Sequence, residues 1–569
     1  MIKLNLLSLF FFVLFFFTNP LLILAQSIQY SSRFPKSRLY NLAPSSLGLD
    51  NIDENFKFSP IANTIRQKTT ITNIVPGDFN YDGNLDMLVM SQPNPGQSNS
   101  EIKLTLYFGN GNDSFDPQSI ELPSARHVLP MILDLTGDMK LDILGYPWEE
   151  NKELPINQLA TWMNMADDST PINHTLFNVT SASNLFNPTS QCTWSSPHSN
   201  AFVDLDGDCL ADVVFVCENK EGFKLSQSFK LPTGAGPLTF ADMDGDGTTD
   251  ILFTTCDGRK CMVHILYNQQ IGLCSKTDGE NLTHCRYLPV PIHAGDYNLD
   301  GYPDLLITTN KKVMLLQSDW CTSTQCTGDQ ILSNKRTFSL VRTGAEPLTK
   351  MNNPRHATFF DIDEDGSLDI LILDGSTSTT AKRIPNFVIN NYFNDAFFIK
   401  GLVSNGALME HSSNKPYGVN YPGATFKFTV LDTSGTKHVH QVPQLPQTSY
   451  LPLQTPYCLF GLGRTNNYVE EMFAGITRHQ KENYIFYEGV IPNSQLVFLP
   501  YQPEKVKDSS TWKVELYIQP ADYIPWVLVS LVAAAIILGT VVGVLYYMEK
   551  REDERERRKA LHIINFDAL

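Results

Sequence analysis

The stretch Asp78-Phe-Asn80-Tyr-Asp82-Gly83-Asn-Leu-Asp86 leads directly into the apolar run Met87 to Met90. Oxygen-bearing side chains stand at positions 1, 3, 5 and 9 of this nine-residue loop. The pattern occurs six times, and the other five loops begin at Asp134, Asp204, Asp242, Asp296 and Asp361. A short β-prone run follows each loop, so the sequence predicts an all-β protein in which every Asp loop leads into a buried strand.

The Asp loops have the composition of calcium sites. Carboxylates crowded into nine residues repel one another unless a cation binds. Hard oxygen ligands in this number suit calcium, with a backbone carbonyl at position 7 and water in the remaining places. We predict structural calcium bound by Asp78, Asn80, Asp82, Asp86, Asp204, Asp206, Asp208, Asp212, Asp242, Asp244, Asp246, Asp250, Asp296, Asn298, Asp300, Asp304, Asp361, Asp363, Asp365 and Asp369.

The loops differ at position 6, where glycine permits a sharp turn. Glycine stands there in four loops, but Met139 and Cys209 replace it in two. Thr136 also replaces a carboxylate, so the Asp134 loop is left out of the predicted sites. An EF-hand is excluded, because position 12 is apolar (Val89) and no helical pattern flanks the loops. The alternative is that Asp, Asn and Gly only form tight turns, although turn chemistry does not call for an acid at position 9.

The spacing of the loops predicts a β-propeller over residues 26–385. The loops start roughly forty to seventy residues apart, which is typical of propellers and related arrays. Strand-like echoes follow several loops, for example Thr161-Trp-Met-Asn and Phe387-Val-Ile-Asn. The stretch Tyr30 to Ile74 is expected to add outer strands to a closing blade, which gives seven blades, with six as the alternative.

Residues 386–520 carry no Asp loop and are predicted to form a membrane-proximal β-sandwich. Thr425 to Leu431 and Thr436 to Val442 flank a Thr433-Ser-Gly turn and are typical of a hairpin. Trp512 to Ile518 alternates with period two and is predicted to be a terminal strand.

The chain ends predict a type I membrane protein at the plasma membrane. Residues 1–25 resemble a secretory signal peptide, with an uncleaved anchor as the alternative. Residues 524–548 are apolar and long enough to span a bilayer, and the tail at 549–569, whose Lys and Arg residues are mixed with acids, is expected on the cytoplasmic side. Ala535, Gly539 and Gly543 fall on one helix face, which leaves a homodimer through this segment as an open alternative.

Cysteines and sequons also favour an extracellular location. All ten cysteines lie between the predicted signal and the predicted span, as in an oxidising compartment. Local bridges are predicted for Cys256 with Cys261, Cys274 with Cys285, and Cys321 with Cys326, while the pairing of Cys192, Cys209, Cys217 and Cys458 stays open. Zinc binding is disfavoured because no CxxC pair occurs. Predicted glycosylation sites are Asn112, Asn173, Asn178 and Asn281. The formal net charge of −17 makes nucleic acid an unsuitable partner.

Two resemblances extend these predictions. The unit of Asp loop, apolar strand and Gly-containing turn resembles the FG-GAP repeat of the integrin α-chain propeller. The segments Phe460-Gly-Leu-Gly-Arg-Thr-Asn-Asn and Ile491-Pro-Asn-Ser-Gln-Leu, with the single span and the ending Asn565-Phe-Asp-Ala-Leu, resemble the T-cell immunomodulatory protein (linkin) family. That resemblance implies a cell-surface glycoprotein in adhesion or tissue integrity, with modulation of T-cell function in animals and shedding of the ectodomain as further implications. The integrin juxtamembrane sequence is missing, so pairing with an integrin β chain is not expected.

The function classes narrow to recognition. An enzyme is not predicted, because the histidines are scattered, no Gly-x-Ser-x-Gly element follows a strand, and the carboxylates are assigned to calcium. The predicted function is extracellular recognition of a protein whose identity the sequence does not give. The alternative is a lectin-like glycan receptor, which aromatic side chains clustered at loop tips would favour.

Overall fold

The computed structural model describes most of the predicted β regions and the C-terminal helix. The described residues are 40–42, 68–95, 100–110, 115–148, 158–166, 176–182, 193–196, 198–217, 231–232, 234–257, 260–268, 291–309, 311–322, 326, 336–351, 353–362, 364–374, 385–392, 396–406, 419–445, 454–464, 468–477, 483–500, 512–518 and 524–563. The chain divides into two compact units, Met1–Leu516 and Tyr517–Leu569. The predicted signal peptide lies outside the described residues.

Each Asp loop joins the first two strands of an antiparallel unit, and position 9 is the first residue of the second strand. The strand pairs around the loops are β2 (Thr70–Gly77) with β3 (Asp86–Gln92), β5 (Phe115–Leu133) with β6 (Asp142–Pro147), β9 (Ala201–Val203) with β10 (Asp212–Val214), β11 (Thr239–Ala241) with β12 (Asp250–Asp257), β14 (Ile292–Gly295) with β15 (Asp304–Thr308), and β18 (Pro354–Phe360) with β19 (Asp369–Asp374).

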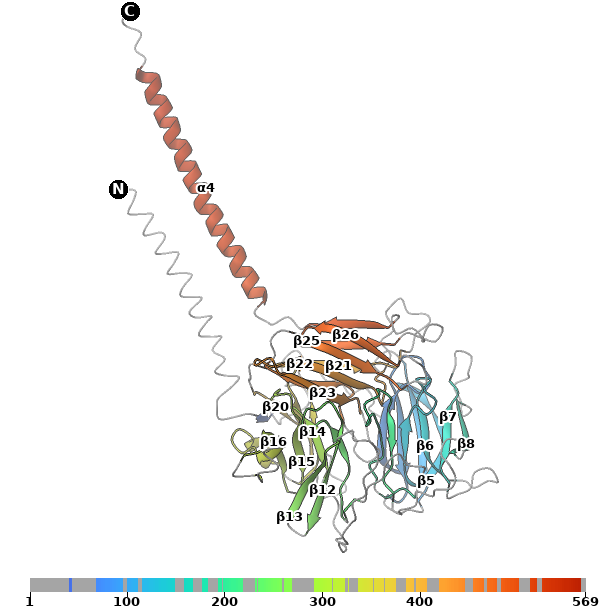
Figure 1. Cartoon of the computed structure of the whole chain (residues 1–569). Coiled ribbons are helices and arrows are strands. Elements are labelled where there is room, and N and C mark those ends of the chain that lie inside the picture. The colour runs from blue at the N-terminus through green and yellow to red at the C-terminus, as the bar shows by residue number, and fades with distance from the viewer. Residues whose placement is uncertain are drawn as a thin grey trace, which may run out of the picture. The chain divides into compact units, whose positions relative to one another are not determined.

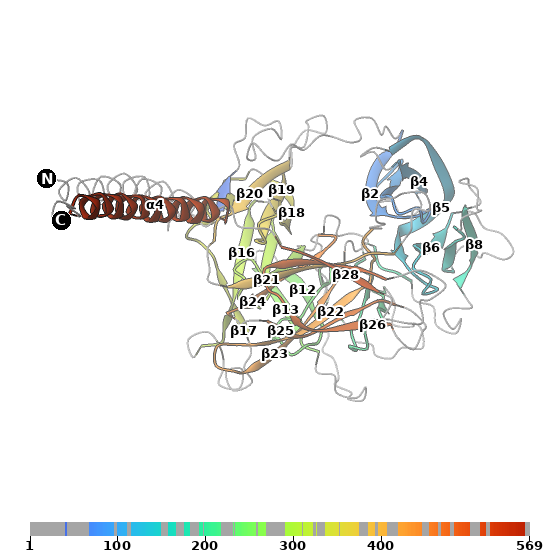
Figure 2. The same cartoon turned by 90° about the horizontal axis from the view of Figure 1, so that it is seen from above.

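Outer strands complete most of these units. They are β4 (Ile102–Gly109), β7 (Ala160–Asn164), β8 (Phe177–Ser181), β13 (Lys260–Leu266), β16 (Val313–Trp320), β17 (Arg336–Leu340) and β20 (Pro385–Asn390). After the initial aspartate, most second strands begin with apolar residues, and every residue of β6 and β15 is buried. The first two units share the long strand β5, so β2 to β8 form one continuous sheet (Figure 2).

The N-terminal strand closes the last unit. Strand β1 (Tyr40–Leu42) pairs antiparallel with β20, so that Tyr40 lies opposite Asn390. This confirms the expectation that the segment before the first loop contributes an outer strand. The described strands form six units, one for each loop, which agrees with the lower of the two predicted blade counts.

The predicted sandwich consists of two four-stranded sheets, in the orders β24-β21-β27-β28 and β23-β22-β25-β26 (Figure 1). Its strands are β21 (Phe397–Val403), β22 (Thr425–Leu431), β23 (Lys437–Pro443), β24 (Cys458–Gly463), β25 (Val469–Gly475), β26 (Tyr484–Val490), β27 (Ser494–Leu499) and β28 (Lys513–Tyr517). The pairing of β22 with β23 confirms the predicted hairpin. Phe426, Phe460 and Phe498 pack together in the core between the sheets.

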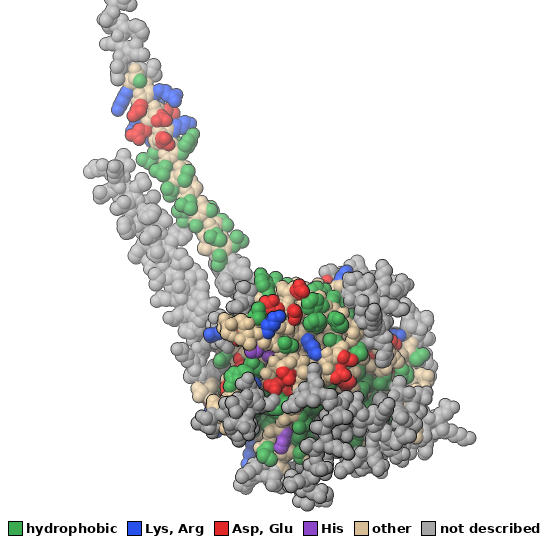
Figure 3. Space-filling view, in the orientation of Figure 1, with side chains coloured by type: hydrophobic (Ala, Val, Ile, Leu, Met, Phe, Trp, Pro, Cys, Tyr) green, Lys and Arg blue, Asp and Glu red, His purple; other side chains and the backbone are tan. Residues whose placement is uncertain are grey.

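The C-terminal helix α4 (Ile524–Ile563) contains one candidate membrane span, Val527–Ala560, within which an 18-residue window has a mean hydropathy of 2.7. Apolar side chains cover its first part, and charged side chains gather toward its end (Figure 3). The helix extends past the predicted span of 524–548 because the following Glu, Lys and Arg residues are good helix formers, and acidic and basic residues four apart can pair. By length and composition, this helix fits a single-pass membrane protein.

The described cysteines agree with the local bridges that the sequence predicted. Cys256 is bonded to Cys261 and Cys321 to Cys326. Cys274 and Cys285 lie outside the described residues. Cys217 is disulfide-bonded, whereas Cys209 and Cys458 are buried free thiols.

An asparagine at the end of the third strand ties neighbouring units together. The Asn390 side chain donates to the carbonyl oxygen of Tyr297 in the preceding unit at 2.9 Å, and to that of Leu368 in its own unit at 3.1 Å. Asn164 and Asn268 make the same pair of bonds in their units. These residues end the Trp-Met-Asn, Tyr-Asn and Val-Ile-Asn echoes of the sequence, so the echoes mark a clamp between units.

Replacement of the clamp residue Asn390 should lower the stability of the protein more than replacement of its neighbour Asn391. We expect Asn390→Ala to lower the free energy of unfolding by about 2–4 kcal/mol, because two carbonyl oxygens lose their donor inside the protein. Asn391→Ala is the matched control, since that half-buried side chain, just after β20, donates within its own unit, to the Ile389 carbonyl oxygen at 3.3 Å. Urea unfolding of the predicted ectodomain (26–520) measures both. Equal losses would contradict the clamp.

A buried histidine predicts a stability loss in acid. His198 Nε2 lies 2.8 Å from the Leu129 carbonyl oxygen, and Nδ1 accepts from the Asn200 backbone N–H at 3.3 Å. Burial disfavours the charged ring and lowers the pKa of His198 to about 4. Because this pKa lies below the unfolded value, the contribution is present above about pH 6.5 and is lost as the pH falls toward 4.

Between about pH 7 and about pH 5 this histidine should cost the wild type about 2 kcal/mol of unfolding free energy. His198→Gln should lose that much less over the same interval, whatever its stability at neutral pH. Urea unfolding at the two pH values measures the difference. An identical pH dependence in both proteins would rule out His198 as the cause.

Candidate metal centre

All six Asp loops share one backbone conformation. Positions 4 and 6 have positive φ in every loop, and these residues are Tyr81 and Gly83, Gly137 and Met139, Gly207 and Cys209, Gly245 and Gly247, Leu299 and Gly301, and Glu364 and Gly366. Met139 and Cys209, with φ of 70° and 69°, therefore adopt the turn that the other loops assign to glycine. The loops without glycine at position 6 are thus folded like the rest.

The aspartate at position 9 links the loop to the rest of its unit through backbone amides. In the Asp242 loop, Asp250 accepts from the N–H of Met243 at 2.9 Å and from the N–H of Asn268, just after the third strand, at 2.7 Å. Asp86, Asp142, Asp304 and Asp369 accept the equivalent pair of bonds. Turn chemistry therefore does give position 9 a reason to be acidic, contrary to the premise used above. Its carboxylate accepts backbone amides, in addition to any cation that it binds.

The aspartate at position 1 faces the interior of its loop. Its Oδ2 accepts from the N–H of position 6 in five loops, at 2.7–3.1 Å, in the pairs Asp78 with Gly83, Asp134 with Met139, Asp204 with Cys209, Asp242 with Gly247, and Asp296 with Gly301. This bond wraps the loop around the place where the remaining side-chain oxygens converge.

Convergence of carboxylates is tightest in two loops. One oxygen each of Asp204, Asp206 and Asp208 lie within 4.8 Å of one another, and so do oxygens of Asp242, Asp244 and Asp250. Such a set of oxygen donors fits a hard cation of the size of calcium. In the Asp78 and Asp296 loops an asparagine at position 3 reduces the carboxylate number, and its amide donates to the position-5 aspartate.

Burial disfavours the ionised form of the loop carboxylates when no cation is bound. It raises the pKa of Asp78 and Asp204 to about 6, of Asp250 to about 7 and of Asp86 to about 8. Burial likewise raises the pKa of Asp242, Asp296 and Asp304 well above the usual range, and neighbouring carboxylates add to the effect. A bound divalent cation would relieve this cost. The residues present therefore fit calcium.

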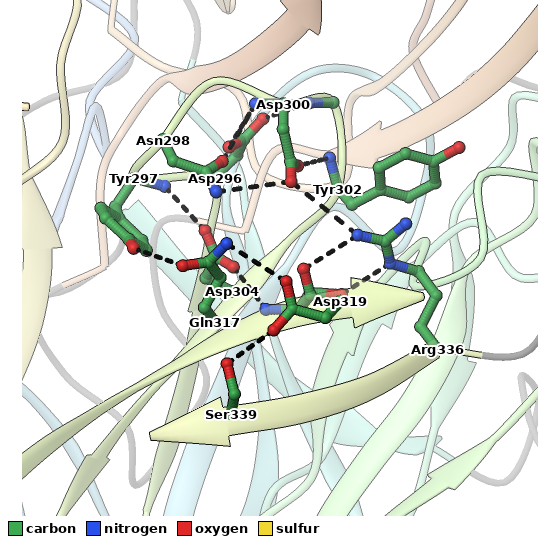
Figure 4. Close-up of polar contacts among 12 residues, drawn as sticks. Asp296, Tyr297, Asn298, Asp300, Tyr302, Asp304, Gln317, Asp319, Arg336 and Ser339 are labelled. Carbon is green, nitrogen blue, oxygen red and sulfur yellow. Dashed lines mark hydrogen bonds and ion pairs between the residues drawn. The ribbon is translucent and has the colours of Figure 1, made fainter. Parts of the chain in front are cut away.

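The Asp296 loop has a basic neighbour that the sequence did not reveal. Arg336 from β17 places its guanidinium 3.8 Å from Asp300 Oδ2 and beside the ring of Tyr302 (Figure 4). The guanidinium also lies over the ring of Trp320. Its positive charge offsets part of the carboxylate charge at position 5. Arg336 is separated by a whole hairpin from the loop, so no local motif in the sequence indicates this contact.

The sandwich lies directly on the loops. Asn405 donates to Asp78 at 2.9 Å, Tyr421 Oη donates to Asp134 at 2.9 Å, and the backbone N–H of Gln441 donates to Asp242 at 3.0 Å. Further contacts join Lys427 to the Gly207 carbonyl and Lys400 to Asp361. At these contacts the loop side of the repeats is therefore an interface within the molecule.

The remaining predicted positions are placed as follows. The position-1 and position-9 aspartates of the last loop, Asp361 and Asp369, are buried, Asp365 is exposed, and Asp363 lies outside the described residues. Asn178 is exposed on β8, an edge strand, where a glycan would meet no neighbouring strand. The sequons at Asn112, Asn173 and Asn281 lie outside the described residues.

Comparison with known proteins agrees with this architecture. The family model for the C2 domain of ITFG1 matches residues 416–517, and the FG-GAP-like repeat model matches residues 242–307 and 296–372. The chain is 30% identical to the T-cell immunomodulatory protein of Mus musculus, over 88% of this chain and 84% of the relative. It is 29% identical to the Homo sapiens protein of the same name, with the same coverage, and 26% identical to protein linkin of Caenorhabditis elegans over 87% and 84%.

Fold and loops together define an all-β protein of FG-GAP repeats joined to a C2-type sandwich and a single apolar helix. The chain belongs to the T-cell immunomodulatory protein family, which confirms the resemblance seen in its sequence. The homologues carry the names of immunomodulatory proteins and of linkin rather than of enzymes.

The two roles of loop carboxylates can be separated in calcium-free protein. Asp250 is fully buried and accepts two backbone amides, whereas Asp246 of the same loop is exposed. With a chelator present, we expect Asp250→Asn to lower the free energy of unfolding by about 2–3 kcal/mol, since an amide group cannot accept on both sides. Asp246→Asn should change it by less than about 0.5 kcal/mol. Urea unfolding gives both values, and equal effects would exclude the amide-binding role.

Proposed function

We propose that this protein is a single-pass cell-surface glycoprotein of the plasma membrane whose extracellular part recognises another protein, and that calcium in its Asp loops keeps this part rigid. The family assignment supports recognition or adhesion as the general role. The observation that carries the calcium role is the approach of three carboxylate oxygens to within 4.8 Å in the Asp204 and Asp242 loops. Calcium here is structural, because the loops lie beneath the sandwich and are tied into it.

The membrane arrangement follows from the sequence and the helix together. A signal peptide at 1–25, a span within α4 and the Lys and Arg residues that follow the span would place residues 26–520 outside the cell. The two disulfides between described cysteines and the exposed sequon at Asn178 agree with an oxidising compartment. Extracellular calcium is abundant enough to fill even weak sites.

The described surface favours a protein over a glycan as partner. Tyr484 and Phe486 are exposed on β26, and their rings contact Phe473 on β25. Glu488 is exposed on the same strand. These aromatic side chains stand on a sheet, with a carboxylate next to Phe486 on the same strand, rather than at the tips of loops. Aromatic residues on a flat, partly charged face are typical of protein interfaces.

Removal of calcium should destabilise the ectodomain strongly. One site at a calcium concentration of about 100 times its Kd contributes about 2.7 kcal/mol, so loss of several sites should lower Tm by about 10 °C or more. Asp246→Ala should reproduce part of this loss in calcium and show a smaller response to chelation. Asp432→Ala is the control, because Asp432 lies in the β22–β23 turn of the sandwich. Differential scanning calorimetry with and without chelator measures these shifts, and an unchanged melting curve would remove calcium from the proposal.

Recognition itself can be tested with beads that carry the ectodomain (26–520) and a panel of cultured cells. We expect saturable adhesion in calcium that is lost when the target cells are treated with trypsin and kept when their glycans are removed enzymatically. Phe486→Ser/Tyr484→Ser should show whether the β26 aromatic side chains contribute. Adhesion that survives trypsin but disappears with the glycans would replace the protein partner by a glycan.

A further inference from the structure

The Asp361 loop differs from the others in what the sandwich brings to it. Lys400 of β21 is buried, and its Nζ lies 3.0 Å from Asp361 Oδ2; the two side chains are 7% and 0% exposed. The same ammonium lies 4.1 Å from the centre of the Tyr457 ring. Tyr457 in turn accepts a hydrogen bond from the backbone N–H of Asp361 at 2.9 Å through its hydroxyl oxygen. A positive charge is therefore held inside this loop by carboxylate and aromatic ring together.

In other loops the sandwich approaches the position-1 carboxylate with neutral donors. Asp78 receives the Asn405 amide, Asp134 the Tyr421 hydroxyl, and Asp242 a backbone N–H. Another sandwich lysine, Lys427, reaches the Asp204 loop, but its Nζ donates to the carbonyl oxygen of Gly207 at 2.7 Å. Neutral donors leave the carboxylate charge in place, so those loops still require a cation.

We infer that the Asp361 loop is not a calcium site, because the ammonium of Lys400 supplies its cation from within the chain. Calcium binds carboxylate oxygens at about 2.3–2.6 Å. An ion on Asp361 Oδ2 would therefore lie no more than about 5.6 Å from an ammonium held at 3.0 Å from the same oxygen. Two buried cations at that separation repel strongly. The loop has the sequence of a calcium site, but the carboxylate at its position 1 is already paired with an ammonium.

The packing around the loop supports a fixed rather than exchangeable cation. A Cβ placed on Gly366, at position 6, would overlap the ring of Phe398, which stands two residues before Lys400 on β21. Strand β21 therefore lies tightly on this loop and carries the ammonium into it. The inference assigns the last repeat a permanent connection to the sandwich that does not depend on calcium. It rests on the proposed function only in taking the other loops to bind calcium.

The first test counts bound calcium on the full chain in detergent micelles, by equilibrium dialysis with calcium alone followed by elemental analysis. Asp361→Asn should leave the number of bound ions unchanged, whereas Asp242→Asn should lower it by one. Lys400→Met should raise the number by one, and this gain should vanish in the double variant Lys400→Met/Asp361→Asn. Loss of one ion in Asp361→Asn would overturn the inference.

The second test measures the energetic coupling between Lys400 and Asp361 in the absence of calcium. With a chelator present, Lys400→Met and Asp361→Asn should each lower Tm, and the double variant should be more stable than the sum of the two losses predicts. Lys427→Met is the matched control and should combine additively with Asp361→Asn. Additive losses for Lys400→Met and Asp361→Asn would overturn the inference. A wild type that binds no calcium but shows the coupling would refute the calcium part of the proposed function and leave the ion pair intact.

Discussion

The structure of the repeats depends on one interaction, the buried carboxylate at position 9 that accepts backbone amides from both sides. It is the first residue of the second strand, and it holds position 2 of its loop and the end of the third strand at a fixed distance. Asp86, Asp250 and Asp304 are fully buried in this role. Because burial of an anion is costly, amide donors alone leave these carboxylates with raised pKa values, and the other acids of the loop increase the cost. The bonds that order the loop therefore also hold negative charge inside the protein, and a bound cation would lower the cost of that charge.

The loops also determine where the sandwich can lie. Their carboxylates and carbonyl oxygens accept hydrogen bonds from the sandwich. The donors are Asn405, Tyr421, Gln441 and Lys427. At Gly461 the approach is so close that a Cβ would overlap Asp296 and Leu299. Calcium bound in such loops would be a component of a domain interface, and the proposed recognition of a partner would use surfaces that this interface leaves open.

Local features were predictable from the sequence because they depend on short segments. The nine-residue pattern fixes a loop conformation, the Thr-Ser-Gly turn fixes a hairpin, and cysteines five residues apart can reach each other. Lys400 and Arg336 escaped prediction, since each meets its loop only through tertiary packing, 39 residues away in the case of Lys400 and Asp361. The clamp formed by Asn164, Asn268 and Asn390 could have been found, because the asparagine recurs at the end of the third strand; its partners in the neighbouring unit could not.

The loops thus look equivalent in sequence and are unequal in charge balance. A neutral donor such as Asn405 or Tyr421 favours the ionised carboxylate but adds no positive charge, so the excess of negative charge in that loop remains. Arg336 reduces that excess at position 5 of one loop, and Lys400 removes a full charge at position 1 of another. Affinity for a divalent cation rises with the number of uncompensated carboxylates. On the proposed calcium role, the arrangement of sandwich residues, and not the loop sequence alone, therefore determines which position-1 carboxylates need a bound cation.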